Sequence, residues 1–166
     1  DRKAWWQQEQ AILAYYILAG VHRKDTYLKH AREASSFYNA FFLDHDDGDI
    51  YFNVLANGIP YLLGTERYKG SHSKSGYHSF ELAYLAAVYS NLLVHKHPME
   101  FYFRPQPGGF KVLRVQPDIL PPGSVRLAQV TLDDKEYADF DSEKLTVNLP
   151  DSESPVHVKV RIDPAE

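Results

Sequence analysis

The hydrophobic residues of this chain follow one period up to about residue 95 and a different period after residue 98. In the first stretch they recur every three or four positions, as on one face of an α-helix. In the second stretch apolar and polar residues alternate over short runs, as in a sheet with one face in water. The sequence therefore predicts an α+β fold, with a helical domain over residues 1–98 and a strand-rich domain over residues 99–166.

Three helices are predicted in the first domain, over about residues 5–19, 25–43 and 79–94. Gly20 is the expected end of the first helix. Asp25 is the expected N-cap of the second, because its side chain can accept a hydrogen bond from a free backbone N–H of the first turn. Consecutive helices of this kind are typical of repeating α/α architectures.

A β-hairpin is predicted between the second and third helices, with strands over 50–55 and 59–63 and Asn57-Gly58 as its turn. In the second domain we expect a small antiparallel β-sandwich. Its predicted strands cover residues 101–103, 110–115, 125–132, 145–149 and 156–162.

Composition and charge exclude several classes of protein. A net charge of -4, with no basic stripe, argues against a nucleic-acid partner. No apolar run is long enough to span a bilayer, so we expect no membrane association. Cysteine is absent, which removes disulfides and thiolate metal sites and is compatible with a cytoplasmic location.

The histidines and the acidic residues are weak candidates for a metal site. The eight histidines are scattered over different predicted elements, so we expect them at the surface and expect no metal cofactor. Four aspartates surround Gly48, but the spacing of an EF-hand calcium loop is not met, and a solvated turn is the expected structure. A glycosidase would need two acids about 5–9.5 Å apart. Glu9 and Glu81 are the candidates, although each is equally explained as a solvated helix residue.

His78 is the strongest candidate for chemistry. A Gly- and Ser-rich loop over residues 69–77 leads to it at the start of the third helix. The positive end of the helix dipole disfavours an imidazolium there, and a neutral ring can accept a proton. The alternative is that His78 only caps or packs the helix. Trp5 and Trp6 are adjacent, so they face different ways; one is expected in the core and the other can face a cavity.

Taken in order, these motifs resemble the C-terminal stretch of the N-acylglucosamine 2-epimerase superfamily, which includes cellobiose 2-epimerases and aldose–ketose isomerases. The resemblance covers about residues 3–95. The motifs that carry it are Trp5-Trp6-Gln7-Gln8-Glu9-Gln10-Ala11, the acidic turn with Gly48, Asn57-Gly58, Lys69-Gly70 and Tyr77-His78.

The resemblance implies the last helices of an α/α toroid, whose earlier helices this chain lacks, and a reaction without metal or nucleotide. The chemistry that the resemblance implies is proton transfer at C2 of a ring-opened sugar, carried out by two histidines on either side of that carbon. His78 matches the C-terminal one, and Trp6, Gln10 and Tyr77 fall among the expected substrate-binding residues. Two positions depart from the family pattern: Gln10 replaces a glutamate, and Ser73 replaces an aromatic residue.

The expected function is therefore that of a carbohydrate epimerase or isomerase, with a mono- or disaccharide as substrate. A fragment of this kind should be inactive alone and should need the rest of the barrel or self-association. A non-catalytic carbohydrate-binding or scaffold protein of the same fold is the first alternative. A glycosidase on an α/α barrel is the second.

Overall fold

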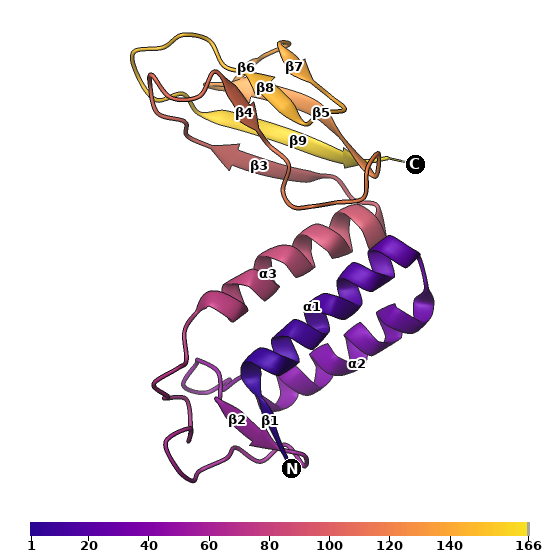
Figure 1. Cartoon of the computed structure of the whole chain (residues 1–166), viewed down its shortest axis with the longest axis vertical. Coiled ribbons are helices and arrows are strands. Elements are labelled where there is room, and N and C mark those ends of the chain that lie inside the picture. Colours follow the sequence, from indigo (N-terminus) through magenta and orange to yellow (C-terminus); the bar gives the residue numbers. More distant parts are fainter. Residues whose placement is uncertain (166) are drawn as a thin grey trace. The chain divides into compact units, whose positions relative to one another are not determined.

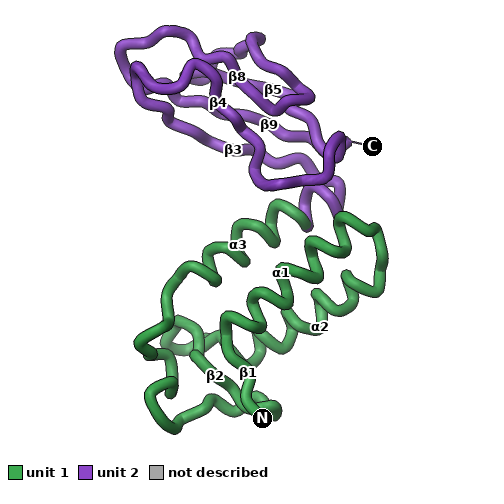
Figure 2. The backbone as a smooth tube through the Cα atoms, in the orientation of Figure 1, with its two compact units in different colours: residues 1–89 green, residues 90–166 purple. Residues whose placement is uncertain are grey.

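The computed structural model describes residues 1–165 of the chain and divides it into two compact units, Asp1–Tyr89 and Ser90–Glu166. Figure 2 shows them in two colours. The first unit carries three α-helices and the second carries antiparallel strands, which confirms the predicted α+β class. The α/α toroid and the domain limit at residue 98 remain predictions.

Three helices form the body of the first unit (Figure 1): α1 (Trp5–His22), α2 (Asp25–Phe41) and α3 (Tyr77–Tyr89). Helix α1 packs against both α2 and α3. The predicted end of α1 at Gly20 is wrong. The helix continues to His22, and Arg23 is its C-cap: the left-handed backbone of Arg23 (φ 52°) lets its N–H bond to the carbonyl of Ala19 at 2.9 Å.

Two other helix ends differ from the sequence prediction. The N-cap of α2 is Lys24, with no side-chain hydrogen bond, so Asp25 is not the cap but the first helical residue. Its negative charge still lies at the positive end of the helix dipole. Helix α3 begins two residues before the predicted Ser79 and continues as a π-helical turn, η1 (Ser90–His95). His78 therefore lies inside the first turn of α3.

The predicted hairpin around Asn57-Gly58 is only partly formed. Strand β2 (Asn53–Leu55) pairs mainly with β1 (Arg2–Ala4), which the sequence did not reveal. The turn itself is present, since the N–H of Leu55 bonds to the carbonyl of Ile59 at 2.8 Å. On its far side a single bridge joins Val54 to Pro60. Proline has no N–H to extend the ladder.

Aromatic rings build the core where the start of α1 packs near β2. Trp5 stands 4.6 Å from Phe52 between ring centroids, and Tyr38 stacks on Phe42 at 5.4 Å. The buried cluster comprises Trp5, Ile12, Tyr38, Phe42, Phe52 and Val54. Helix α1, helix α2 and the β2 segment thus share one core.

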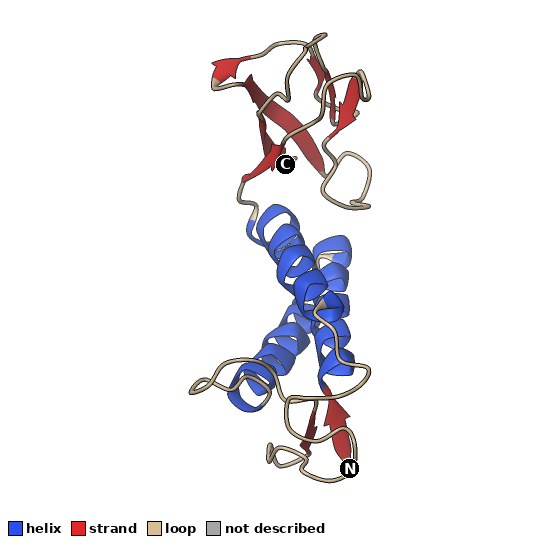
Figure 3. Ribbon diagram, turned by 90° about the vertical axis from the view of Figure 1, so that its left-hand side faces the viewer, coloured by secondary structure: helices blue, strands red, loops and turns tan. Residues whose placement is uncertain are grey.

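Two antiparallel sheets make up the second unit, and Figures 1 and 3 show the smaller sheet as a second layer beside the larger one. The larger sheet has the strand order β3-β9-β5-β6, and the smaller one has the order β4-β8-β7. The strands of the two sheets are β3 (Met99–Phe103), β4 (Val112–Arg114), β5 (Val125–Leu132), β6 (Lys135–Glu136), β7 (Phe140–Asp141), β8 (Thr146–Asn148) and β9 (Val158–Pro164).

Alternating residues of these strands are buried, as the period of two predicts. Val158, Val160 and Ile162 of β9 are inside. Strand β5 buries Leu127 and Val130, which are three positions apart. A bulge between Leu127 and Gln129 makes this possible, because its extra residue shifts the alternation by one position.

Candidate functional site

A buried carboxyl group lies where the three helices of the first unit meet. Glu9 of α1 is completely buried. Its Oε1 accepts hydrogen bonds from the hydroxyl of Tyr38 on α2, at 2.5 Å, and from the Oγ of Ser79 on α3, at 2.7 Å. The expectation of a solvated Glu9 is therefore wrong, because this face of α1 points into the helix junction.

The surroundings of Glu9 are strongly shielded from water. Burial raises the pKa of Tyr38 far above its usual value, and the hydrogen bond to Glu9 adds to the effect. Within residues 1–165, the Oε2 of Glu9 and the Nε1 of Trp5 are buried without a hydrogen-bond partner. Glu9 consequently has a structural position, and no substrate can reach it in this arrangement.

The next residue of α1 faces a different group of side chains. The Nε2 amide of Gln10 donates to Oε2 of Glu81 at 2.6 Å and lies 3.2 Å from Nδ1 of His78. Both partners belong to the first turns of α3 and are three residues apart, so they share one face of that helix. The direct distance from His78 Nδ1 to Glu81 Oε2 is 3.9 Å.

Three aromatic rings surround the imidazole of His78. The ring centroids of Trp6, Trp5 and Tyr77 lie 5.9, 6.1 and 5.0 Å from it. Trp5 is buried in the core, whereas Trp6 is 40% exposed, so the two tryptophans point to different environments as their adjacency predicts. His78 itself is partly exposed beside Trp6.

The structure thus brings together Trp6, Gln10, Tyr77 and His78, the four residues singled out in the sequence. It adds Glu81, which was considered only as half of a glycosidase pair. The signal that could have found its contact with Gln10 is the spacing of three from His78 on a helix, which places both side chains on one face.

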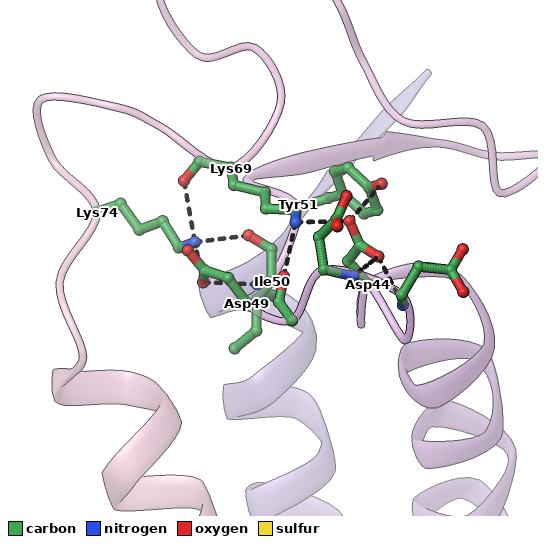
Figure 4. Close-up of polar contacts among 9 residues, drawn as sticks. Asp44, Asp49, Ile50, Tyr51, Lys69 and Lys74 are labelled. Atoms are coloured by element: carbon green, nitrogen blue, oxygen red, sulfur yellow. Dashed lines mark hydrogen bonds and ion pairs between the residues drawn. The ribbon is translucent and has the colours of Figure 1, made fainter.

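A second polar cluster fixes the loop that leads to His78 (Figure 4). Lys69 pairs with Asp44 at 2.5 Å, and Lys74 pairs with Asp49 at 2.6 Å. Lys74 also donates to the backbone carbonyls of Ile50 and Lys69. The acidic turn is therefore not simply solvated, because two of its four aspartates hold the loop before α3.

These ion pairs depress the pKa values of both paired carboxyl groups. The hydrogen bond from Lys69 holds the pKa of Asp44 far below its usual value, with help from the backbone N–H of Asp47. Lys74 does the same for Asp49. Within the described part of the chain, no group of three His, Asp or Glu side chains is arranged to hold a metal ion. No helix of residues 1–165 is long and apolar enough to cross a membrane.

Comparison with known proteins gives one structural match. No protein-family model matches the sequence, and no curated protein matches it. Among solved structures, the chain is similar to cellobiose 2-epimerase from Bacillus thermoamylovorans B4167, with 23% sequence identity and a TM-score of 0.45. The match covers 52% of this chain and 21% of that epimerase.

Proposed function

We propose that this chain forms part of a carbohydrate epimerase- or isomerase-like site, in which His78 takes part in proton transfer at C2 of a ring-opened sugar. The observation that carries the proposal is the convergence of Gln10, Glu81 and His78 beside the exposed ring of Trp6. An imidazole held by neighbouring polar groups is the side chain most often used for proton transfer in enzymes.

Trp6 supplies the binding surface in this proposal. Its ring is substantially exposed, and the Trp6 and His78 planes are tilted by only 30°. An indole offers a broad apolar face together with a polar N–H. A sugar lying on that face packs its C–H groups on the ring and brings its hydroxyl and carbonyl oxygens near the imidazole.

The site is not sufficient for catalysis by itself. Removing a proton next to a carbonyl develops negative charge on oxygen, which needs preorganised donors for its stabilisation. A second acid–base group is also needed on the other side of C2. We propose that these groups come from the remainder of an α/α barrel or from a second copy of the chain.

A non-catalytic carbohydrate-binding protein is the second candidate. The observation in its favour is that an uncharged amide, that of Gln10, contacts the imidazole. Glycoside hydrolysis by Glu9 and Glu81 is disfavoured, since the Glu9 side chain is completely buried and hydrogen-bonded to Tyr38 and Ser79.

Deuterium exchange separates the two candidates. The protein is incubated with aldoses and disaccharides in D₂O, and deuterium at C2 is measured by NMR and mass spectrometry. We expect exchange that is lost in His78→Ala and kept in His30→Ala, whose ring lies on the exposed face of α2. Sugar binding that weakens in Trp6→Ala, without any exchange, would favour the binding protein. If neither exchange nor binding occurs, both candidates are rejected.

A further inference from the structure

We infer that Glu81 and Gln10 are positioning residues that hold the neutral ring of His78 in one tautomer, with its proton on Nε2. His78 would then present a hydrogen-bond donor, and not a proton acceptor, to a ligand over Trp6. The role toward a sugar rests on the proposed function, whereas the tautomer follows from the protein alone.

The first step is the orientation of the Gln10 amide. A glutamine side chain ends in an oxygen that accepts and a nitrogen that donates. A carboxylate can only accept, so at 2.6 Å from Glu81 the Gln10 side chain must present its NH₂ group. The opposite orientation would place two acceptor oxygens in contact. The Glu81 charge therefore fixes which way Gln10 points.

The second step is the state of the imidazole. The same amide nitrogen, which carries two hydrogens, lies 3.2 Å from Nδ1 of His78. One hydrogen faces Glu81 and the other is available to Nδ1. An N–H on Nδ1 would face this donor, so Nδ1 must carry the lone pair. In a neutral ring the proton is then on Nε2.

Glu81 acts through Gln10, and not by contacting the ring. Its carboxylate lies 3.9 Å from Nδ1, which is too long for a hydrogen bond. Helix α2 provides a natural contrast. There His30 and Glu33 have the same spacing of three residues, and Nδ1 lies 3.5 Å from the carboxylate; the structure shows no amide bonded to the His30 ring within the described residues. A carboxylate facing Nδ1 directly favours a proton on that nitrogen.

The tautomer assigns a role to His78. In the proposed reaction this makes His78 the donor of the acid–base pair: a neutral ring with its proton on Nε2 cannot take the C2 proton at that atom, but it can donate a hydrogen bond to the carbonyl oxygen next to C2. Neutral imidazoles polarise carbonyl groups in this way. A separate base, an imidazole or a carboxylate, would take the C2 proton; the C–H electron pair would form the enediolate double bond, and the carbonyl oxygen would gain the charge that the Nε2–H stabilises.

Nitrogen-15 NMR of the histidine rings tests the tautomer without any substrate. In the intact protein, at a pH where the rings are neutral, we expect Nδ1 of His78 to give a pyridine-type signal and Nε2 a pyrrole-type signal. Glu81→Gln is nearly isosteric and lets the Gln10 amide turn, so we expect loss of the single tautomer. Glu33→Gln is the matched control and should change only the signals of His30.

Gln10→Leu is the second variant, because it removes the amide and leaves Glu81 in place. We expect it also to abolish the preference of His78 for Nε2–H, with a backbone spectrum that confirms folding. A proton on Nδ1 in the unaltered protein, or a His78 tautomer unchanged in both variants, would overturn the inference.

The outcome is separable from that of the proposed function. If His78 has its proton on Nε2 and the protein neither binds sugars nor exchanges deuterium with them, this inference holds and the proposed function is rejected. If the protein exchanges deuterium at C2 and His78 has its proton on Nδ1, the proposed function holds and this inference is rejected.

Discussion

Glu9 is the residue on which the junction of the three helices depends most. One oxygen of its side chain accepts from hydroxyls on two other helices, and the whole side chain is buried. A buried polar group that loses its partner costs about 1–3 kcal/mol. Removing the Glu9 side chain would leave two hydroxyl groups without this acceptor, that of Tyr38 on α2 and that of Ser79 on α3.

We therefore expect Glu9→Ala to lower the free energy of unfolding by about 3 kcal/mol or more, since a cavity adds to the two lost bonds. Glu9→Gln keeps an acceptor oxygen and should cost only about 1 kcal/mol. Urea denaturation measures both. Glu33→Ala, at an exposed position of α2, is the control and should stay within about 0.5 kcal/mol of the original protein. Equal effects of Glu9→Ala and Glu33→Ala on the free energy of unfolding would refute the structural role of Glu9 at the helix junction.

At this scale the sequence predicts the chemistry of the side chains better than their surroundings. His78 is a candidate from its place at a helix start, and Trp6, Gln10 and Tyr77 are candidates through the family resemblance; the four side chains lie close together in the structure. The burial of Glu9 was not predicted, because adjacent helix positions differ in direction by about 100° and the sequence does not show which of Glu9 and Gln10 faces the core. The rotation of α1 about its axis decides which of the two is buried, and packing against α2 and α3 sets that rotation.

Among the elements, the loop before α3 is held by ion pairs more than by regular structure. Lys74 is the main link, because its amino group contacts one carboxylate and two backbone carbonyls from different parts of the chain. Only 14% of its side chain is exposed. This loop sets where α3 begins, and therefore where His78 lies.

Acid should loosen the loop. The pKa values of Asp44 and Asp49 are lowered in the folded protein, so their contribution is complete above the ordinary aspartate pKa of about 4 and is lost as the pH falls through the depressed values. We expect amide-exchange protection of residues 50–76 to fall below about pH 4. Lys74→Met should show the same loosening at neutral pH, whereas Lys29→Met, in an exposed helix pair, should not. An unchanged loop in Lys74→Met would contradict this role.

The helices and most strands were predicted within a few residues, because their hydrophobic periods are sustained. The ends of the elements differ more from the predictions. Gly20 is the predicted end of α1, yet Arg23 takes the left-handed conformation at the C-cap. Strand β1 has only three residues and no visible alternation, and β2 pairs with it and not with a full hairpin partner. Such pairings depend on distant parts of the chain, which local patterns do not record.

Each of the two compact units of the molecule buries hydrophobic residues of its own. Those of the first unit lie among its helices and aromatic residues. Those of the second unit lie among its strands, where Leu127, Val147 and Val160 are almost fully buried. A compact unit with its own core has its own stability.

We expect Leu127→Ala to destabilise the second unit by about 2–5 kcal/mol, the usual cost of truncating a buried leucine. Hydrogen exchange followed by mass spectrometry should show the loss of protection in residues 90–165 and little change in residues 1–89. Val112→Ala, at an exposed position of the smaller sheet, is the control. A uniform loss of protection over both units would show that they unfold together.

The short bond between Gln10 and Glu81 also limits what evolution can place at these two positions. A glutamate at position 10 would bring two acids within hydrogen-bonding distance, and two acids that close share one proton. Related proteins that carry an acid at the position of Gln10 should therefore have a neutral residue at the position of Glu81. An aligned set of relatives would reveal this exchange as paired substitutions.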